Sequence, residues 1–394
     1  MNNRRIDLLD SFRFLAVLGV LLYHFTFEWK ARTPYGNYFG DLFRYGYFGV
    51  AFFFIISGFV ISYTLESTGS LSLFWRHRFI RLFPALLLCS LLSYMAAVLL
   101  DNDQLSSQVI LSPNPRLPAL PLPPNALLFP NAHKISNFLP TLTLTNPNIW
   151  NSLNSLAGSP APGIHFAWIN GSYWSLWVEI QFYLVASLLY FWNKKNFFRN
   201  ILLAAIILDI VKDIPPFLLN GRWRSAFSQG LVDFLSGWNY TNAVFNIDYY
   251  ILWFTLGVIF HYLYKWRNSV TLRPVTILLL AIVLVQFCRN KVYEPGMLHL
   301  LMAGLFLIMI YKKKYLFFLD NPLFRRIGVI SYTVYLIHEV AGVLLIHKYG
   351  SILGRWSPLA PFIMIVLVLG FAELSYRFYE KKTAAVLKTI LKAP

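Results

Sequence analysis

Four ionisable side chains lie in or beside one apolar stretch near the start of this 394-residue chain: Asp10, Arg13, His24 and Glu28. An ionisable group in the middle of a membrane costs about 2.5–3.5 kcal/mol on insertion scales, so each predicts a partner or a function. At about 100° per helical residue, Arg13 and His24 share a face and lie about 16 Å apart along the axis. Asp10 and Glu28 fall near that face, which predicts a polar stripe along the helix.

His24 is the candidate general base, because imidazole changes its charge near neutral pH. Glu179 lies in a second apolar stretch, residues 171–192. As part of a helix it would lie about 12 Å from the start of that stretch, at a depth in the membrane similar to that of His24. A carboxylate that faces an imidazole fixes its tautomer and stabilises its protonated form, so we expect Glu179 to support His24. The alternative is a glutamate that only holds helices together.

Two histidines compete with His24 as candidates: His338 within residues 327–347 and His261 within 246–265. We expect His338 to support the site together with Asp10, Tyr335 and Ser175. His261 is interpreted as a structural residue.

Arg78 and Arg81 stand three residues apart at the start of a third apolar stretch, so they project together from a helix. Guanidinium groups bind phosphates by bidentate, charge-assisted hydrogen bonds, and the positive end of the helix adds to this attraction. We expect Arg78, Arg81 and Arg13 to bind the phosphates of a donor molecule. The alternative is that Arg78 and Arg81 only orient the helix in a membrane.

Other chemistries lack their signatures. Cys89 and Cys288 have neither CxxC nor metal-type spacing, which argues against a disulfide framework and a zinc site. The sequence contains no Gly-x-Ser-x-Gly elbow, no P-loop and no clustered metal ligands, so we expect no metal.

The composition excludes a soluble globular protein: 57% of residues are hydrophobic and only 13% are charged, about half the usual charged fraction. Several apolar runs approach or reach the roughly 17–25 residues that a membrane-spanning helix needs. We therefore predict an all-α integral membrane bundle of about ten transmembrane helices in a single domain, residues 1–394. The predicted helices cover residues 7–28, 47–65, 78–100, 171–192, 197–212, 246–265, 274–289, 296–312, 327–347 and 358–379.

The distribution of Lys and Arg predicts the orientation, because cytoplasmic loops carry the excess. Placing both termini inside gives 21 basic residues on that side and 12 outside, with Arg13 within the first helix. Topology and an anionic ligand on the inner side thus account for the net charge of +17, and we expect no nucleic-acid partner.

Two long connections fall outside in this topology. Residues 101–170 hold 11 of the 21 prolines and predict a Pro-rich extracytoplasmic loop, while residues 213–245 form a second extracytoplasmic segment. Acceptor binding could be built there; a disordered loop is the alternative for the Pro-rich part.

Together these stretches resemble the acyltransferase-3 family of multi-pass membrane acyltransferases, from about residue 5 to 380. Ten residues separate Arg13 from His24, a spacing similar to the family's basic-residue-x10-His motif. The segment from Arg78 to Arg81 is similar to the family's Arg-x-x-Arg motif. Residues 47–61 are similar to the family's second helix and residues 174–183 to its fourth. Weaker agreement comes from residues 331–338 and 375–380. Phe14 stands where the family usually has Gly, so packing beside Arg13 is expected to differ. Lys381 stands where the family commonly has Pro, and neither departure touches the proposed chemistry.

The resemblance implies transfer of an acyl group, commonly acetyl, from cytoplasmic acyl-CoA to a hydroxyl of an extracytoplasmic glycan or glycolipid. It also implies a bacterial inner-membrane protein, in contact with membrane lipid, of the form without an appended extracytoplasmic domain. His24 would act as general base on the acceptor or as a nucleophile that carries the acyl group. The sequence leaves open the acceptor, the acyl chain and the oligomeric state.

Two other functions fit the same residues. A transporter or flippase of lipid-linked sugars could use the Arg/His/Glu stripe as a proton relay. A receptor or assembly factor could keep the scaffold without catalysis.

Overall fold

The computed structural model describes residues 6–101, 129–156, 165–219, 228–289 and 296–392. These residues form helices, turns and short connections, with no strand among them, which confirms the all-α fold class. Within these ranges, five continuous helical segments are long and apolar enough to cross a membrane: Asp7–Glu28, Phe48–Ser67, Leu71–Leu100, Gly171–Trp192 and Pro322–Ile390. Each of the ten predicted ranges contains a helix, and how many of them cross the membrane stays a prediction.

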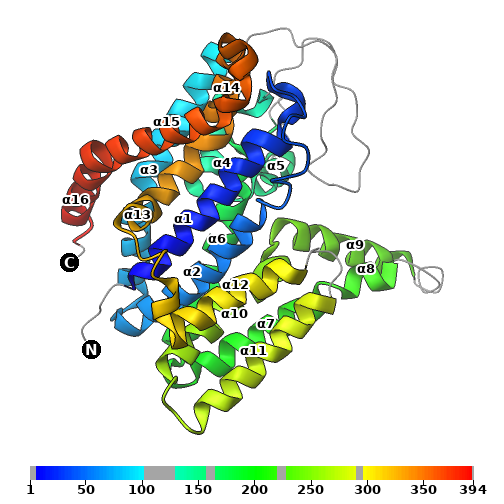
Figure 1. Cartoon of the computed structure of the whole chain (residues 1–394). Helices are drawn as coiled ribbons and strands as arrows, with labels where there is room; N and C mark the ends of the chain where they lie inside the picture. Colours follow the sequence, from blue (N-terminus) through cyan, green and yellow to red (C-terminus); the bar gives the residue numbers. More distant parts are fainter. Residues whose placement is uncertain (1–5, 102–128, 157–164, 220–227, 290–295, 393–394) are drawn as a thin grey trace. The chain divides into compact units, whose positions relative to one another are not determined.

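The chain divides into two compact units, which are described separately. The first unit comprises residues 1–9, 51–75 and 176–321. It holds most of α2 (Phe48–Ser67) and α6 (Trp174–Trp192), together with helices that follow in order along the chain (Figure 1). These are α7 (Phe197–Val211), α8 (Ile214–Leu219), α9 (Gln229–Val244), α10 (Ile247–Lys265), α11 (Leu272–Arg289) and α12 (Gly296–Tyr311).

Helix α10 is the centre of the first unit, and most of its residues are buried. It packs against α7, α11 and α12, and its backbone approaches α2 closely at two glycines. A Cβ added to Gly58 would lie 2.0 Å from the Phe254 carbonyl oxygen, and one added to Gly257 would lie 2.0 Å from that of Ile55. Only glycine permits this helix contact.

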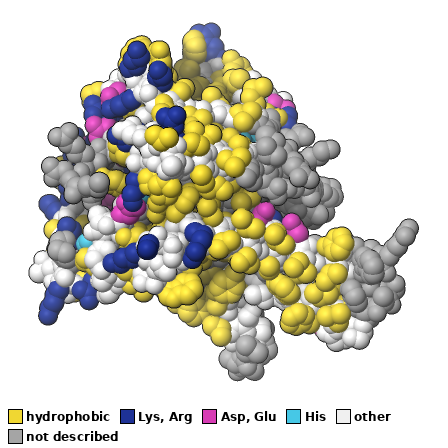
Figure 2. Space-filling view, turned by 90° about the horizontal axis from the view of Figure 1, so that it is seen from below, with side chains coloured by type: hydrophobic (Ala, Val, Ile, Leu, Met, Phe, Trp, Pro, Cys, Tyr) yellow, Lys and Arg dark blue, Asp and Glu magenta, His cyan; other side chains and the backbone are white. Residues whose placement is uncertain are grey.

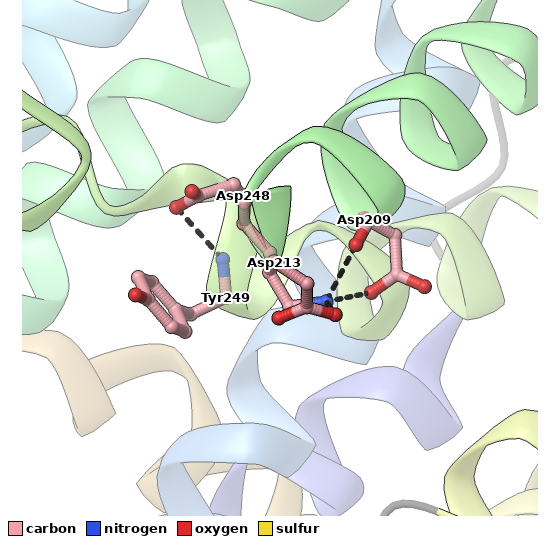
Figure 3. A network of polar contacts seen from close by, with 5 residues as sticks. Asp209, Asp213, Asp248 and Tyr249 are labelled. Carbon is pink, nitrogen blue, oxygen red and sulfur yellow. Dashed lines mark hydrogen bonds and ion pairs between the residues drawn. The ribbon is translucent and has the colours of Figure 1, made fainter. Parts of the chain in front are cut away.

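A polar network closes one end of α7 and α10 in the same unit (Figure 3). The Lys212 ammonium contacts the Asp209 carboxylate and lies 3.5 Å from Asp213. Asp248, in the first turn of α10, accepts from the backbone N–H of Tyr249 at 3.0 Å. Residues 213–245, predicted as one outer segment, therefore begin beside this network, and their described part includes α8 and α9.

The second unit comprises residues 10–50, 76–175 and 322–394. Helix α1 (Asp7–Tyr23) continues into a π turn, His24–Glu28, and α3 (Leu71–Leu100) stays helical through Pro84. The described part of the predicted Pro-rich loop holds α4 (Phe138–Thr143) and α5 (Pro147–Leu156), whereas residues 102–128 and 157–164 lie outside the described ranges. The C-terminal part holds α13 (Pro322–Ile337), α14 (Val343–Tyr349), α15 (Ala360–Ser375) and α16 (Lys381–Ile390).

Helices α13 and α1 touch through their backbones. A Cβ added to Gly328 would lie 1.8 Å from the Asp10 carbonyl oxygen, far inside van der Waals contact. Helix α13 also packs along α15, and the Arg326 guanidinium holds Glu373 of α15 by two hydrogen bonds of 2.7 and 2.8 Å. This packing fixes α13, which His338 follows directly, against α1, which His24 follows directly.

Large apolar side chains remain exposed on both units, as a lipid solvent allows. Examples are Ile207 and Ile210 on α7, and Val366 and Leu367 on α15. The face drawn in Figure 2 carries many hydrophobic side chains, with Lys and Arg among them. These exposures fit a membrane protein.

Candidate active site

His24 and His338, both in the second unit, meet where two helices change from α to π winding. His24 opens the π turn His24–Glu28, and His338 opens the π turn His338–Gly342. Their rings lie edge to face with centroids 4.7 Å apart, and His338 Nε2 is 3.3 Å from His24 Nδ1. Single π turns inside α-helices are frequent at functional sites.

The hydrogen bonds of this pair define which nitrogens carry protons. His338 Nδ1 lies 2.7 Å from the Tyr335 carbonyl oxygen, and a carbonyl can only accept, so Nδ1 donates and Nε2 presents its lone pair. His24 Nδ1 lies 3.0 Å from the Val20 carbonyl oxygen and near that lone pair, so it also carries a proton. In the neutral His24 ring, Nε2 is therefore the basic atom.

The predicted supporting residues Ser175 and Tyr335 are in contact. Ser175 Oγ lies 2.7 Å from the Tyr335 hydroxyl, which also donates to the Ser172 carbonyl at 2.9 Å. Both side chains are buried. They join the start of α6 to the helix turn that ends at His338.

Asn170 and Tyr173 strengthen the same junction, although the sequence analysis assigned them no role. Asn170 Nδ2 and the Tyr173 hydroxyl both donate to the Leu336 carbonyl oxygen, each at 3.1 Å. Asn170 Oδ1 also accepts from the Ser172 backbone N–H at 3.0 Å. These bonds position the backbone just before His338.

Glu339 is a third residue of the site that the sequence pattern did not single out. The residue is 8% exposed, and its carboxylate accepts from the Ser172 backbone N–H at 2.7 Å. It lies within electrostatic range of both His24 and Glu28. The signal was present in the sequence, because a glutamate inside an apolar stretch is as costly as the histidine before it.

The other residues of the predicted polar stripe, Asp10, Arg13 and Glu28, contact residues close to them in the sequence. Arg13 Nη1 lies 2.7 Å from Asp10 Oδ1, an ion pair with little exposure. Glu28 accepts from the Tyr23 hydroxyl, five residues earlier, which is the spacing of a π turn. The spacing of about 100° per residue that predicted the polar stripe therefore applies only as far as Tyr23, where the α-helix ends.

Arg78 and Arg81 differ in environment although they are three residues apart. Arg78 is buried and Arg81 is exposed. Helix α3 begins at Leu71, seven residues before Arg78, so the positive end of the helix lies about 10 Å from it along the axis. The prediction that the positive end of the helix adds to phosphate binding is therefore wrong, because that end lies too far from Arg78. The two guanidinium groups themselves remain the candidates.

Glu179 belongs to the first unit, as does His261. The Glu179 carboxylate accepts from the Ser57 hydroxyl at 2.6 Å and from the Tyr183 hydroxyl at 2.5 Å. His261 Nδ1 lies 2.8 Å from Ser62 Oγ, and both residues are buried between α2 and α10. A polar packing role fits His261; support of His24 by Glu179 stays a prediction.

The described part of the chain holds no group of three or more His, Cys, Asp or Glu that could bind a metal ion. An open apolar hollow of about 420 Å³ lies in the second unit, beside α4. None of the candidate residues lines it. Its lining residues are Ile135, Ser136, Phe138, Leu139, Leu142, Thr143 and Phe166.

Comparisons with known proteins identify the family of this chain. Residues 6–377 match the acyltransferase domain that defines the acyltransferase-3 family, and the chain therefore belongs to that family. The helical bundle and this match make it a membrane protein of the acyltransferase class.

Its curated relatives include a candidate O-acetyltransferase of Staphylococcus aureus strain COL, 26% identical over 96% of this chain and 57% of the relative. The O-acetyltransferase OatA of S. aureus strain NCTC 8325 is 26% identical over 94% of this chain and 56% of OatA. The chain thus spans a little over half the length of these relatives. No solved structure matches it.

Proposed function

We propose that this chain transfers an acyl group, most simply acetyl, from cytoplasmic acyl-CoA to a hydroxyl of an extracytoplasmic glycan or glycolipid. The observation that carries the proposal is the His24–His338 pair, which leaves Nε2 of His24 as the basic atom inside a membrane bundle. The family match and the names of the O-acetyltransferase relatives support acyl transfer as the reaction.

In the proposed reaction, His24 Nε2 takes the proton of the acceptor hydroxyl while the oxygen attacks the thioester carbonyl carbon. The tetrahedral intermediate then collapses, the carbon–sulfur bond breaks, and the imidazolium returns the proton to the CoA sulfur. An ester and free CoA are the products. A positioned general base of this kind contributes about 10²–10⁴-fold to the rate.

The surrounding groups have separate proposed roles. Arg78, Arg81 and Arg13 bind the donor phosphates, and Asp10 fixes Arg13 through its ion pair. His338 holds the His24 tautomer, with Ser175 and Tyr335 fixing the turn that presents it. Glu179 and Glu339 are the carboxylates that would stabilise the imidazolium.

A covalent route is the second mechanism for the same function. His24 Nε2 would attack the thioester, release CoA and carry the acyl group until the acceptor hydroxyl displaces it. Acid quenching of the protein with labelled acetyl-CoA and no acceptor separates the routes. The general-base route predicts no label on the polypeptide, whereas the covalent route predicts label that His24→Ala removes.

We place both termini in the cytoplasm of a bacterial inner membrane, because the basic residues concentrate on that side. The test of substrate is mass spectrometry of surface glycans from cells with and without the chain. We expect a gain of one acyl mass on a defined sugar, which would also identify the acceptor. Identical glycans in the two strains, with the protein present in the membrane, would contradict an envelope glycan as acceptor.

A further inference from the structure

In helix α16 (Lys381–Ile390), two of the three lysines lie opposite the apolar side chains, and Lys382 lies at the border of the apolar side. At about 100° per residue, Lys381 and Lys388 project within about 20° of each other, while Ile390 projects from the opposite side. Val386 and Leu387 flank Ile390 on the apolar side. The helix begins after residue 377, where the match to the family domain ends.

The apolar side of α16 is not covered by the described part of the protein. None of the helix residues is buried, and Val386 and Ile390 are 57% and 66% exposed. Its main packing partner is the π turn Tyr376–Glu380, which joins it directly to α15 (Figure 1). This side of the helix is therefore open to a partner outside the described part of the protein.

The charge of α16 points to one kind of partner. Lys381, Lys382 and Lys388 are all exposed, and the sequence has no Asp or Glu after Glu380. The Glu380 carboxylate itself accepts from the Thr333 and Ser375 hydroxyls, each at 2.8 Å. The helix thus presents three positive charges, and the nearest carboxylate in the sequence is engaged with its own unit.

We propose that α16 lies on the membrane surface, with its apolar face among the lipid chains and its lysines on anionic phospholipid headgroups. Helix α15, which carries exposed apolar side chains, leads directly into it, so α16 begins where a spanning segment leaves the bilayer. A basic amphipathic helix binds such an interface by apolar burial plus attraction to anionic lipid. This inference does not depend on the proposed acyl transfer.

Photo-crosslinking in the full-length chain tests the proposal. A photoreactive amino acid replaces Ile390, or Lys388 in a second variant, and the protein is reconstituted in nanodiscs of phosphatidylcholine and phosphatidylglycerol. We expect adducts to the acyl chains of lipids from position 390, and far fewer acyl-chain adducts from position 388, whose side chain faces the headgroups. The ratio of phosphatidylglycerol to phosphatidylcholine among the adducts should exceed their ratio in the bilayer by about fivefold. This is the factor expected for one lysine at an anionic surface.

Two matched triple variants identify the source of the lipid preference. Replacing Lys381, Lys382 and Lys388 by Gln should abolish the enrichment and keep the lipid adducts from position 390. Replacing Lys312, Lys313 and Lys314 by Gln removes the same charge elsewhere and should leave the enrichment intact. Adducts to protein instead of lipid, no adducts at all, or an enrichment that survives the first variant would overturn the proposal.

Discussion

His338 Nε2 faces His24 Nδ1 across 3.3 Å, and the backbone carbonyls of Tyr335 and Val20 orient the two rings. Because a carbonyl oxygen can only accept, Nδ1 of each ring carries a proton. In the contact between the rings, His24 Nδ1 therefore donates and His338 Nε2 accepts. His338 therefore stabilises one tautomer of His24 and would also stabilise its protonated form during the reaction.

Replacing His338 removes the acceptor that holds the His24 tautomer. We expect His338→Ala to lower kcat by about 10- to 100-fold, a part of the about 10²–10⁴-fold that a positioned base supplies. His338→Gln keeps an oxygen acceptor near the position of Nε2 and should recover part of the rate. Initial rates with thermal unfolding of each variant measure this; equal kcat for Ala and Gln at equal stability would argue for a packing role alone.

The two carboxylates are tested by conversion to amides. Glu339→Gln keeps an acceptor for the Ser172 N–H but removes the charge near His24, so kcat should fall about tenfold while stability is retained. Glu179→Gln should also lower kcat if it supports the imidazolium. Glu66→Gln is the control, because Glu66 pairs with Lys265 at a more exposed site in the first unit. A wild-type rate for either site variant would remove that carboxylate from the mechanism.

The contact of α13 with α1 depends on Gly328. Gly328→Ala would force Cβ against the Asp10 carbonyl oxygen. We therefore expect the free energy of unfolding to fall by about 1–3 kcal/mol or more, the cost typical of overpacking. Gly370→Ala in α15 meets open space and should change stability little. Thermal unfolding in detergent compares the two. Equal stability of both variants would show that the helices separate without cost.

Arg78 is the stronger candidate for donor phosphates, because it is buried whereas Arg81 is exposed. Loss of a charge-assisted hydrogen bond costs about 1.5–3 kcal/mol, so Arg78→Gln should raise the KM for acyl-CoA about 10- to 100-fold. Arg81→Gln should have a smaller effect, and Arg76→Gln, which removes an exposed charge from the same helix, almost none. Unchanged KM for the Arg78 and Arg81 variants would leave these residues as topology signals.

Much of the fold follows from the sequence, because length and apolar content alone determine that a segment becomes a helix in lipid. The polar residues His24 and His338 were found for the same reason, since each is costly where it stands. Glu339 satisfies that criterion equally and was overlooked beside its histidine neighbour. The π turns could not be predicted, because one inserted residue in a helix leaves no periodic signal in a single sequence.

The start of α3 shows a second limit. The apolar run around Arg78 suggested a helix that begins there, yet the helix starts at Leu71 and carries Arg76 and Arg78 within it. Arginine is a good helix former, so a helix continues through charges that end a hydropathy signal. The contact of Asn170 and Tyr173 with Leu336 joins segments over 160 residues apart, which no local pattern encodes.

The most direct test of the account is ester formation by the purified, reconstituted protein with labelled acetyl-CoA and a surface-glycan extract. We predict labelled ester from the wild-type chain, at least about 10²-fold less from His24→Ala, and full activity from His165→Ala, which alters an exposed histidine. Folded His24→Ala that forms ester at the wild-type rate would contradict the assignment of His24 as the reacting base.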